Sequence, residues 1–424
     1  MADVIIVGGG LAGLACALEL RAQGVEPLIL EASDQVGGRV RTDRVEGFRL
    51  DRGFQVVQTW YPEARRVLDY PALDLRPFEP GALVRWEGRL HRVSDVWRRP
   101  WRAGEMLTSG VGTLADKLRL VRLRRRALAG DLHRLYARPE TDALGRLRAM
   151  GFSARIIERF FKPFFAGVFF EPELAVSSHA FDFVFRAFAL GDAALPALGM
   201  GAIPAQLAAR LPQGSIRLNA PVAEIGDGWA RLGGGERIEG AALVIATDAP
   251  AAARLLGWPA PATRGTTCFY FAAERPPVAG PYLVLNGESG GLINSLLCPS
   301  SLSEHYAPPG RHLIAVNVLG AGAQPEALEA NLRQELGGWF GPEVQRWRRL
   351  AVYQLPEALP VQAPPVPDPA ERNPKLGGRI YLCGELDGAP SFHWALDSGR
   401  RAASAVACDL AVAGRPAPVT PAAR

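Results

Sequence analysis

The sequence predicts an α/β fold, in which a discontinuous Rossmann-like nucleotide-binding domain carries an inserted α+β domain. Three observations lead to this prediction. A strand, a glycine-rich turn, a helix and a second strand follow one another within residues 3–31. Buried-strand patterns of the same kind recur in the middle of the chain and near its C-terminus. Two insertions, one mostly helical and one rich in strands, separate these three regions.

The length of the chain sets the expected number of domains. A single hydrophobic core stops growing at roughly 250–300 residues, so 424 residues predict two domains. The nucleotide-binding domain is expected to comprise residues 1–75, 215–260 and 375–424. The inserted domain, which we expect to bind the substrate, comprises residues 76–214 and 261–374.

The first βαβ unit follows from local patterns. Val4, Ile5, Ile6 and Val7 form a β-branched run typical of a buried parallel strand. Apolar residues at helical spacing predict a helix over 12–23, which Gly24 ends. A second short strand is expected over 27–30, so that Glu31 lies at its carboxyl end.

The turn between the first strand and the helix has the pattern GxGxxG. Gly8 permits the tight turn, Gly10 lets the backbone approach a pyrophosphate, and Gly13 lets the helix pack closely on the strand. The pyrophosphate would bind at the helix N-terminus, and Glu31 would accept hydrogen bonds from ribose hydroxyls. The candidate nucleotide contacts in this unit are Gly8, Gly10, Leu11, Ala12, Gly13, Glu31 and Ala32.

A second glycine motif, Val36-Gly37-Gly38-Arg39-Val40-Arg41-Thr42, follows directly. Paired glycines again allow close approach to a ligand, and Arg39 offers forked donors to a phosphate or a flavin carbonyl. Together with Glu31 this segment resembles the signature of the superfamily of flavin-containing amine oxidases, protoporphyrinogen oxidases and phytoene desaturases. The resemblance implies FAD as the cofactor and adds Gly37, Gly38 and Arg39 to its candidate contacts.

The C-terminal region resembles the FAD motif with which this superfamily ends. The motif comprises residues 379–385, 388–391 and 395–399. In relatives it is a strand, a Gly-acid step and a helix whose positive end faces the isoalloxazine, which favours anionic reduced flavin. The resemblance implies that Glu385 binds the ribityl chain or the diphosphate. The candidate contacts here are Gly384, Glu385, Ser391, Phe392, Ala395 and Leu396, and His393 is the candidate general base, with a structural cap as the alternative.

Two shorter matches complete the resemblance. The segment 48–55 is similar to the loop that passes along the flavin, which implicates Gly53, Phe54 and Gln55. The segment 221–225 is similar to the strand whose main chain reads the adenine, here at Val222. Gly320-Ala321-Gly322 is interpreted as a helix-entry turn rather than a second nucleotide site, because Pro325 stands where a third glycine is needed.

The remaining elements are expected in the insertions. A hairpin is predicted over 82–93 with its turn at Glu87-Gly88. The pattern is mostly helical from about 112 to 210 and rich in strands from about 265 to 320. A helix is expected over 326–339, a proline-rich loop over 356–374, and a C-terminal helix over 393–413.

The function predicted from these motifs is FAD-dependent oxidation or desaturation of a hydrophobic substrate, carotenoid-like or tetrapyrrole-like, by hydride transfer to flavin. Amine oxidases of the superfamily usually place a lysine near flavin N5, and none of Lys117, Lys162 and Lys375 lies in a segment resembling that region. No cysteine stands just before the C-terminal motif, so FAD is expected to be non-covalent. A flavin amine oxidase and an FAD-requiring isomerase without net redox turnover remain alternatives.

The phenylalanine-rich segment 160–188 has two interpretations. It is either an ordinary helical core or the wall of a pocket for a long apolar substrate. Glu171, His179 and Asp182 lie in this segment and are further candidates for the pocket.

Composition and charge limit the remaining classes. The formal net charge of +5 is small for this length, and no nucleic-acid motif accompanies it. Five dispersed cysteines predict neither a disulfide framework nor a metal site, and they fit a cytoplasmic protein. Residues 96–102 mix Trp with Arg, and basic residues are frequent in 119–126. This pattern is typical of a solvated basic face or of a peripheral membrane contact. The substrate, the electron acceptor and the oligomeric state are left open.

Overall fold

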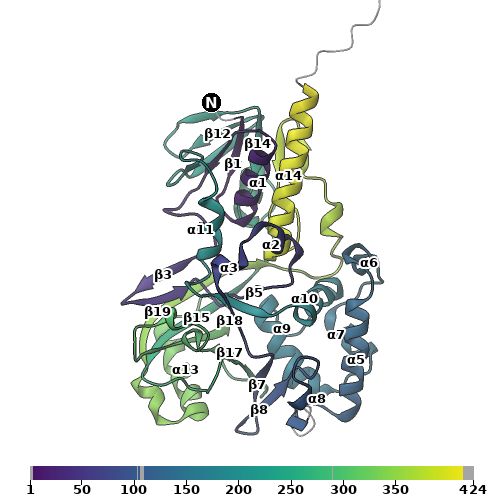
Figure 1. Ribbon diagram of the computed structural model, residues 1–424, viewed down its shortest axis with the longest axis vertical. Coiled ribbons are helices and arrows are strands. Elements are labelled where there is room, and N and C mark those ends of the chain that lie inside the picture. The colour runs from purple at the N-terminus through teal and green to yellow at the C-terminus, as the bar shows by residue number, and fades with distance from the viewer. Residues whose placement is uncertain (1–2, 103, 106–108, 289, 414–424) are drawn as a thin grey trace, which may run out of the picture. The chain divides into compact units, whose positions relative to one another are not determined.

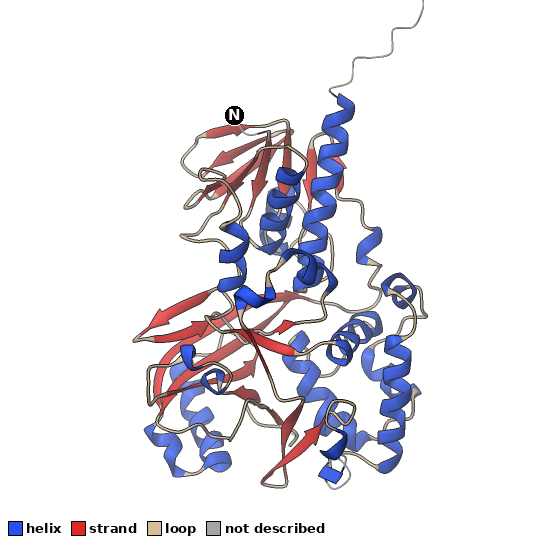
Figure 2. Cartoon of the chain, in the orientation of Figure 1, coloured by secondary structure: helices blue, strands red, loops and turns tan. Residues whose placement is uncertain are grey.

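The computed structural model describes residues 3–102, 104–105, 109–288 and 290–413, and Figures 1 and 2 show the chain by residue number and by secondary structure. The chain divides into two compact units. Unit 1 comprises Met1–Gly38, Pro204–Ala260 and Pro369–Arg424. Unit 2 comprises Arg39–Ile203 and Pro261–Asp368.

Unit 1 is built on a six-stranded sheet with the strand order β10-β2-β1-β14-β21-β20. All neighbours are parallel except β20 and β21, which pair antiparallel. Helices α1 and α14 run side by side next to this sheet (Figure 1). The bounds of these elements are β1 Val4–Val7, α1 Leu11–Ala22, β2 Pro27–Leu30, β10 Ile216–Arg217, β14 Ala242–Ile245, β20 Lys375–Gly377, β21 Ile380–Leu382 and α14 Phe392–Ala413.

Burial explains why these segments form a central sheet. All four residues of β1 are buried, and β1 lies between β2 and β14 in the sheet. A continuous apolar strand is what a sheet covered on both faces requires. The predicted βαβ unit is confirmed, with α1 beginning and ending one residue earlier than expected.

The other elements of unit 1 lie between the sheet strands in sequence. Strands β11, β12 and β13 form a small antiparallel sheet, and its apolar residues join the core of the central sheet. Helix α11 crosses the boundary between the two units in sequence. The bounds are α11 Ala202–Ala208, β11 Val222–Gly226, β12 Trp229–Leu232, β13 Arg237–Glu239, α12 Ala249–Leu256 and η6 Pro369–Glu371.

Unit 2 contains a seven-stranded mixed sheet with the order β19-β15-β18-β17-β16-β7-β8. Helix α13 packs on this sheet through Leu332 and Leu336. The predicted hairpin is confirmed, and its turn residues Glu87 and Gly88 have φ angles of 48° and 71°. The bounds are β7 Gly81–Trp86, β8 Arg89–Ser94, β15 Thr263–Ala273, β16 Leu283–Asn286, β17 Ile293–Leu297, β18 His312–Leu319, α13 Pro325–Phe340 and β19 Arg348–Pro360.

The proline-rich segment was expected to be a loop from residue 356, and this expectation is wrong for its first five residues. Strand β19 continues to Pro360. It is an edge strand that pairs only with β15 in the seven-stranded order. Because an edge strand has N–H groups that need no partner in the sheet, it tolerates Pro356 and Pro360.

The helical insertion of unit 2 is packed around phenylalanine rings. Phe161, Phe165 and Phe181 are almost fully buried, and the ring centroids of Phe165 and Phe181 lie 4.5 Å apart. Their packing favours the interpretation of this segment as a helical core. The bounds are η1 Pro100–Arg102, α5 Leu114–Leu128, α6 Leu132–Tyr136, α7 Ala143–Ala149, α8 Ala154–Ile156, η2 (a π-helix) Ile157–Phe161, α9 Lys162–Phe169 and α10 Ser178–Leu190.

The shorter elements of unit 2 include two small sheets. Strands β3 and β4 form an antiparallel pair, and β9 lies between β5 and β6. Strand β9 lies within the region 112–210 that was predicted to be mostly helical, and the prediction missed it. The bounds are β3 Thr42–Val45, β4 Phe48–Asp51, β5 Val57–Gln58, α2 Pro62–Val67, α3 Tyr70–Leu73, β6 Leu75–Pro77, β9 Ala193–Pro196, η3 Pro299–Ser301, η4 Glu304–Tyr306 and η5 Pro342–Arg346.

The buried carboxylate of Asp51 joins several segments of unit 2. One of its oxygens accepts hydrogen bonds from the Thr42 hydroxyl (2.5 Å) and the Met200 N–H (2.9 Å). The other oxygen accepts a bond from the Tyr306 hydroxyl at 2.8 Å. The main-chain carbonyl of Asp51 accepts the Tyr270 hydroxyl at 2.7 Å. These contacts tie the segment around Asp51 to the rest of unit 2, although residues 39–75 were expected to belong to the nucleotide-binding domain.

We expect Asp51→Asn to remove one component of the pH dependence of stability. Burial raises the pKa of Asp51 from 3.8 to about 6, against the hydrogen bonds from Thr42, Met200 and Tyr306. The folded state therefore binds this proton more tightly than the unfolded state. The resulting stabilisation is present below about pH 4 and is lost as the pH rises through about 6, a change of about 3 kcal/mol.

Urea unfolding between pH 4 and pH 7.5 measures this change. The free energy of unfolding of the wild type should fall with rising pH relative to that of Asp51→Asn. Asp248→Asn is the matched control, because Asp248 is an exposed carboxylate that caps α12. If the free energy of unfolding depends on pH in the same way for the wild type and Asp51→Asn, the raised pKa of Asp51 is contradicted.

Candidate functional site

The turn between β1 and α1 presents backbone N–H groups at the start of a helix. Gly10 is the N-cap of α1, and it has no side chain with which to cap the helix. The Leu14 N–H bonds the Gly10 carbonyl at 2.9 Å. The N–H groups before Leu14 therefore lie outside the helical ladder, as the first N–H groups of a helix do. They form a site that favours an anion.

Gly10 and Gly13 differ in what a side chain would meet. A Cβ added to Gly10 would find no atom within 4 Å. A Cβ added to Gly13 would lie 2.0 Å from the Gly8 carbonyl oxygen. Gly13 is thus required by packing within the turn, whereas Gly10 borders open space. Open space above uncapped N–H groups fits the pyrophosphate of a dinucleotide.

Glu31 lies at the carboxyl end of β2 and is 8% exposed. One carboxylate oxygen accepts the Gly9 N–H at 2.6 Å. The other oxygen accepts the N–H and the hydroxyl of Ser33 at 2.9 and 2.7 Å. These bonds fix the carboxylate beside the glycine turn, where a ribose hydroxyl would donate to its remaining lone pairs. Ala32, between the two bonding residues, is exposed.

Two parts of this arrangement were not predicted. Ser33 was not among the candidates, although a hydroxyl two residues after a strand-ending carboxylate is a signal for such a turn. The second glycine motif bonds to the first, because the Gly37 N–H donates to the Gly9 carbonyl at 2.9 Å. A Cβ on Gly38 would lie 3.6 Å from the Gly10 Cα. Gly38 therefore lies directly beside Gly10 at this turn.

The C-terminal motif is organised by two serines. The Ser398 hydroxyl accepts the Gly384 N–H at 2.9 Å and donates to the Ala395 carbonyl at 3.0 Å. The Ser391 hydroxyl accepts the Trp394 N–H at 3.1 Å, just before α14 begins at Phe392. Leu396 is fully buried. The Gly-acid step is thereby held against the first turns of α14.

Helices α1 and α14 approach each other at a glycine. A Cβ on Gly399 would lie 2.2 Å from the Ala12 carbonyl oxygen and 3.0 Å from the Cys16 N atom. Cys16 and Cys383 are buried in the same unit, and burial raises the pKa of both thiols well above the usual range. The N-terminal and C-terminal motifs are thus packed together within unit 1.

Three further candidates of unit 1 have visible contacts. A Glu385 carboxylate oxygen accepts the N–H of Ala249 at 2.9 Å, at the start of α12. His393 is 4% exposed, and its ring centroid lies 4.6 Å from that of Trp394, edge to face. The β11–β12 register shifts between Val222 and Glu224, so the ladder is interrupted beside Val222. None of these contacts assigns a ligand, and the roles of these residues stay predictions.

The remaining candidates lie in unit 2. A guanidinium nitrogen of Arg39 donates to the Ala358 carbonyl. The Gln55 amide nitrogen donates to the carbonyls of Arg39 (2.8 Å) and Arg52 (3.0 Å). A Cβ on Gly53 would lie 2.7 Å from a methyl carbon of Leu355. The loop 52–55 is therefore held by its own backbone and by β19, and Phe54 within it is half-buried.

Buried polar atoms without partners occur in the same part of the chain. Among the described residues, the Gln55 amide oxygen and both amide atoms of Gln58 have no hydrogen-bond partner. Gln58 lies on β5 and is 3% exposed. A buried polar group without a partner is unfavourable, which makes Gln58 a candidate for contact with a ligand or an ordered water. Gln58 was not among the predicted site residues, since a glutamine three residues past a loop carries no distinguishing signal in the sequence.

The other candidates of the helical insertion have separate surroundings. Glu171 lines a small cavity of about 70 Å³ together with Phe169 and Arg264. Its carboxylate accepts the Ala175 N–H at 2.6 Å. Asp182 is fully buried and pairs with Arg146 at 3.0 Å. His179 Nε2 contacts the Arg138 carbonyl at 2.8 Å. Only Glu171 of the three faces this cavity.

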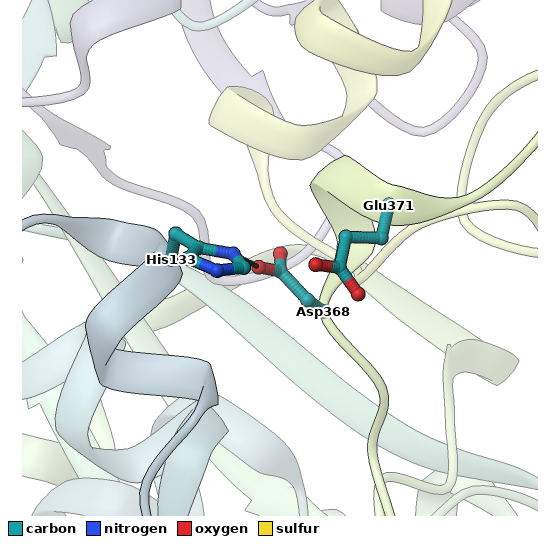
Figure 3. A group of neighbouring side chains, drawn as sticks. All are labelled: His133, Asp368 and Glu371. Atoms are coloured by element: carbon teal, nitrogen blue, oxygen red, sulfur yellow. Dashed lines mark hydrogen bonds and ion pairs between the residues drawn. The ribbon is translucent and has the colours of Figure 1, made fainter.

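One histidine–carboxylate pair of unit 2 is shown in Figure 3. His133 Nδ1 lies 3.1 Å from a carboxylate oxygen of Asp368. Figure 3 also draws Glu371, which belongs to unit 1. A single exposed histidine beside a carboxylate is an ordinary surface pair. It provides no reason to assign a metal.

Comparison with known families covers nearly the whole chain. The family model described as flavin containing amine oxidoreductase matches residues 11–407. This range includes residues of both units.

Three individual proteins illustrate the extent of the similarity. A segment of 181 residues, 39% of this chain, is 30% identical to coproporphyrinogen III oxidase of Propionibacterium freudenreichii and spans 31% of that protein. A segment of 59 residues, 14% of this chain, is 42% identical to carotenoid 3,4-desaturase of Haloarcula japonica and spans 11% of it. Each match thus spans less than a third of the relative. Cyclohexylamine oxidase of Brevibacterium oxydans superposes with a TM-score of 0.71 at 18% identity, covering 97% of this chain and 99% of that chain, which shows the fold.

The open space at Gly10 generates a first prediction for this site. Gly10→Trp should keep the fold and lose FAD, because the added side chain meets no protein atom at its Cβ and would occupy the space for the pyrophosphate. Gly13→Ala should lower the melting temperature instead, because its Cβ would collide with the Gly8 carbonyl. Flavin absorbance per protein and thermal unfolding distinguish the two. A yellow Gly10→Trp protein with full FAD content would contradict the assignment.

The unsatisfied amide of Gln58 generates a second prediction. Gln58→Leu should raise the free energy of unfolding of the flavin-free protein by about 1–3 kcal/mol, because it removes two buried atoms without partners. The gain should shrink in the flavin-loaded protein if a bound ligand satisfies the amide. Gln354→Leu is the control and should be destabilising, since the Gln354 amide donates to the Ala323 carbonyl. If Gln58→Leu raises the free energy of unfolding equally in the flavin-free and the flavin-loaded protein, the Gln58 amide does not contact the bound ligand.

Proposed function

The chain belongs to the flavin-containing amine oxidoreductase family, and on this premise we propose that it oxidises or desaturates a hydrophobic substrate, carotenoid-like or tetrapyrrole-like, using non-covalently bound FAD. A flavin-dependent oxidoreductase acting on small molecules follows from the family. The substrate class and the manner of FAD binding are the proposed part.

The cofactor proposal is supported by the residues of unit 1. FAD, when bound, accepts a hydride from the substrate. The N–H groups at the start of α1 would bind its pyrophosphate, and Glu31 would bind its ribose. Among the described residues, four of the five cysteines are buried and the fifth, Cys408, lies 16 residues into α14. None stands in the segment where some relatives attach flavin covalently.

The observation that carries the substrate proposal is the position of the three lysines. Lys162 Nζ lies 2.8 Å from Glu173, and Lys375 Nζ lies 2.7 Å from Asp409. Lys117 is on α5. Two of the three are thus held in ion pairs with surface carboxylates, and none lies in a segment predicted to contact flavin. Hydride removal from carbon needs orientation and exclusion of water rather than a charged partner.

Some relatives support this proposal, and others support amine oxidation as the alternative. The curated matches include a coproporphyrinogen III oxidase and a carotenoid 3,4-desaturase, whose names give a tetrapyrrole and a carotenoid as substrates. The superposed cyclohexylamine oxidase acts on an amine, so a flavin amine oxidase is the alternative. The phenylalanine-rich helices give less support than expected, because their rings pack mostly on one another.

His393 remains the proposed proton acceptor. Its side chain is buried in the first turn of α14, next to candidate contacts of the flavin. A neutral imidazole can accept a proton and would take up the one released on oxidation. His393→Asn should then lower the rate of flavin reduction without changing the FAD content, whereas a structural cap would lower both.

Anaerobic mixing with three probe substrates tests the proposal. Coproporphyrinogen III or a carotenoid should bleach the flavin, and cyclohexylamine should not. Bleaching by the amine alone would return the function to amine oxidation. Conversion of an apolar substrate into an isomer without bleaching would instead favour an isomerase that needs FAD.

We further expect that no lysine is needed for chemistry. Replacing Lys117, Lys162 and Lys375 together by Arg should leave flavin reduction largely intact, because arginine can keep the ion pairs to Glu173 and Asp409. The measurement is the anaerobic bleaching rate at saturating substrate. A hundredfold loss corresponds to about 2.7 kcal/mol of transition-state stabilisation, and such a loss on changing one lysine would support the amine-oxidase alternative.

A further inference from the structure

Helix α5 carries apolar residues on the side that faces solvent. Leu114 and Leu118 are 69% and 75% exposed, and Val121 is 38% exposed. The opposite side of the helix is buried through Leu123 and Ala127. An amphipathic helix of a globular protein normally turns its one apolar side inward. Helix α5 therefore has a second apolar side that nothing in unit 2 covers among the described residues.

The exposed residues form one continuous stripe. Leu114, Leu118 and Val121 have the spacing i, i+4 and i+7, which places them on one face over two turns. We call these three residues, with the exposed Arg122 and Arg125, the α5 surface. Contiguous exposed apolar side chains of this kind mark an interaction site more often than scattered ones.

The helix that carries this surface is held firmly in unit 2. Thr113 and Asp116 form a capping box at its start. The Asp116 carboxylate also accepts the Ser153 N–H at 2.9 Å and the Ser153 hydroxyl at 2.5 Å. Although burial opposes it, these hydrogen bonds lower the pKa of Asp116 to about 2. Asp116 is the single acidic residue of α5, and it is turned away from the α5 surface.

The charge of the helix is strongly positive. Besides Asp116, α5 contains Lys117 and five arginines, at positions 119, 122, 124, 125 and 126. Within the described part of the chain, no ion pair involves Arg122 or Arg125. Exposed cations beside an exposed apolar stripe match the two features of an anionic lipid surface, its charged headgroups and its apolar interior.

Two exposed tryptophans lie in the residues that precede α5 in sequence. The Trp97 ring lies beside α5, with its centroid 4.9 Å from the Arg124 guanidinium carbon, and it is 42% exposed. Trp101 is 73% exposed. Tryptophan is favoured at membrane–water interfaces because it combines a large apolar ring with a polar N–H.

We propose that the α5 surface docks on an anionic membrane, with its leucines inserted among the lipids and its arginines at the headgroups. Within the described residues, no helix is both long and apolar enough to cross a bilayer, so the contact would be peripheral. A second copy of the chain is a poorer occupant, because a two-fold contact would bring the same arginines face to face. The proposal stands on this surface and is independent of the substrate.

Co-sedimentation of the flavin-loaded protein with vesicles tests it. The wild type should bind vesicles of phosphatidylcholine with phosphatidylglycerol at low salt, be released at high salt, and bind pure phosphatidylcholine far less. Leu114→Ser with Leu118→Ser should lower binding by about tenfold or more, and Arg122→Gln with Arg125→Gln should do the same at low salt.

The matched control is a pair of exposed apolar residues in unit 1. Leu218→Ser with Trp258→Ser changes side chains that are 38% and 46% exposed and should leave vesicle binding unchanged. FAD content and melting temperature confirm that each variant is folded. Failure of the wild type to bind anionic vesicles, or equal loss in the control pair, overturns the proposal. A concentration-dependent dimer that the Leu114→Ser, Leu118→Ser variant abolishes would assign the surface to a second copy instead and also overturn it.

Discussion

The architecture of unit 1 depends on backbone contacts that leave no room for a side chain. A Cβ on Gly8 would lie 2.8 Å from the Ala246 carbonyl, one on Gly13 would lie 2.0 Å from the Gly8 carbonyl, and one on Gly399 would lie 2.2 Å from the Ala12 carbonyl. Three regions of the chain, far apart in sequence, thus meet around one turn. This constraint explains why the unit is assembled from separate segments, since each supplies a backbone surface that the turn requires.

The elements predicted best are those whose signals are local. The βαβ unit could be read to within one residue, because a β-branched run, a glycine turn and helical spacing all lie within 31 residues. The extension of β19 to Pro360 could not, because proline is tolerated there only as a consequence of an edge position. Likewise Asp51 looked like one residue of a loop motif, and its partners Met200 and Tyr306 are distant in sequence.

In the candidate site, too, residues with local sequence signals were predicted and residues defined by distant contacts were not. The glycines and Glu31 belong to a motif whose spacing carries its own physical explanation, so they were found without the structure. Gln58 and Ser33 were not found, because only three-dimensional contacts reveal that one amide lacks partners and that one hydroxyl fixes a carboxylate. The phenylalanine-rich segment was ambiguous for a related reason. The sequence indicates that the phenylalanine rings are buried, but only the structure shows whether they contact one another or a ligand.

The burial of the thiols has a consequence for chemical labelling. Cys16, Cys268, Cys298 and Cys383 are buried, and Cys408 on α14 is exposed. Because the thiolate is the reactive form, raised pKa values and lack of access protect the buried thiols from maleimides and iodoacetamide. The native protein therefore offers a single handle for a fluorophore in unit 1. Slow modification of the other four would measure how often the interiors of the two units open to solvent.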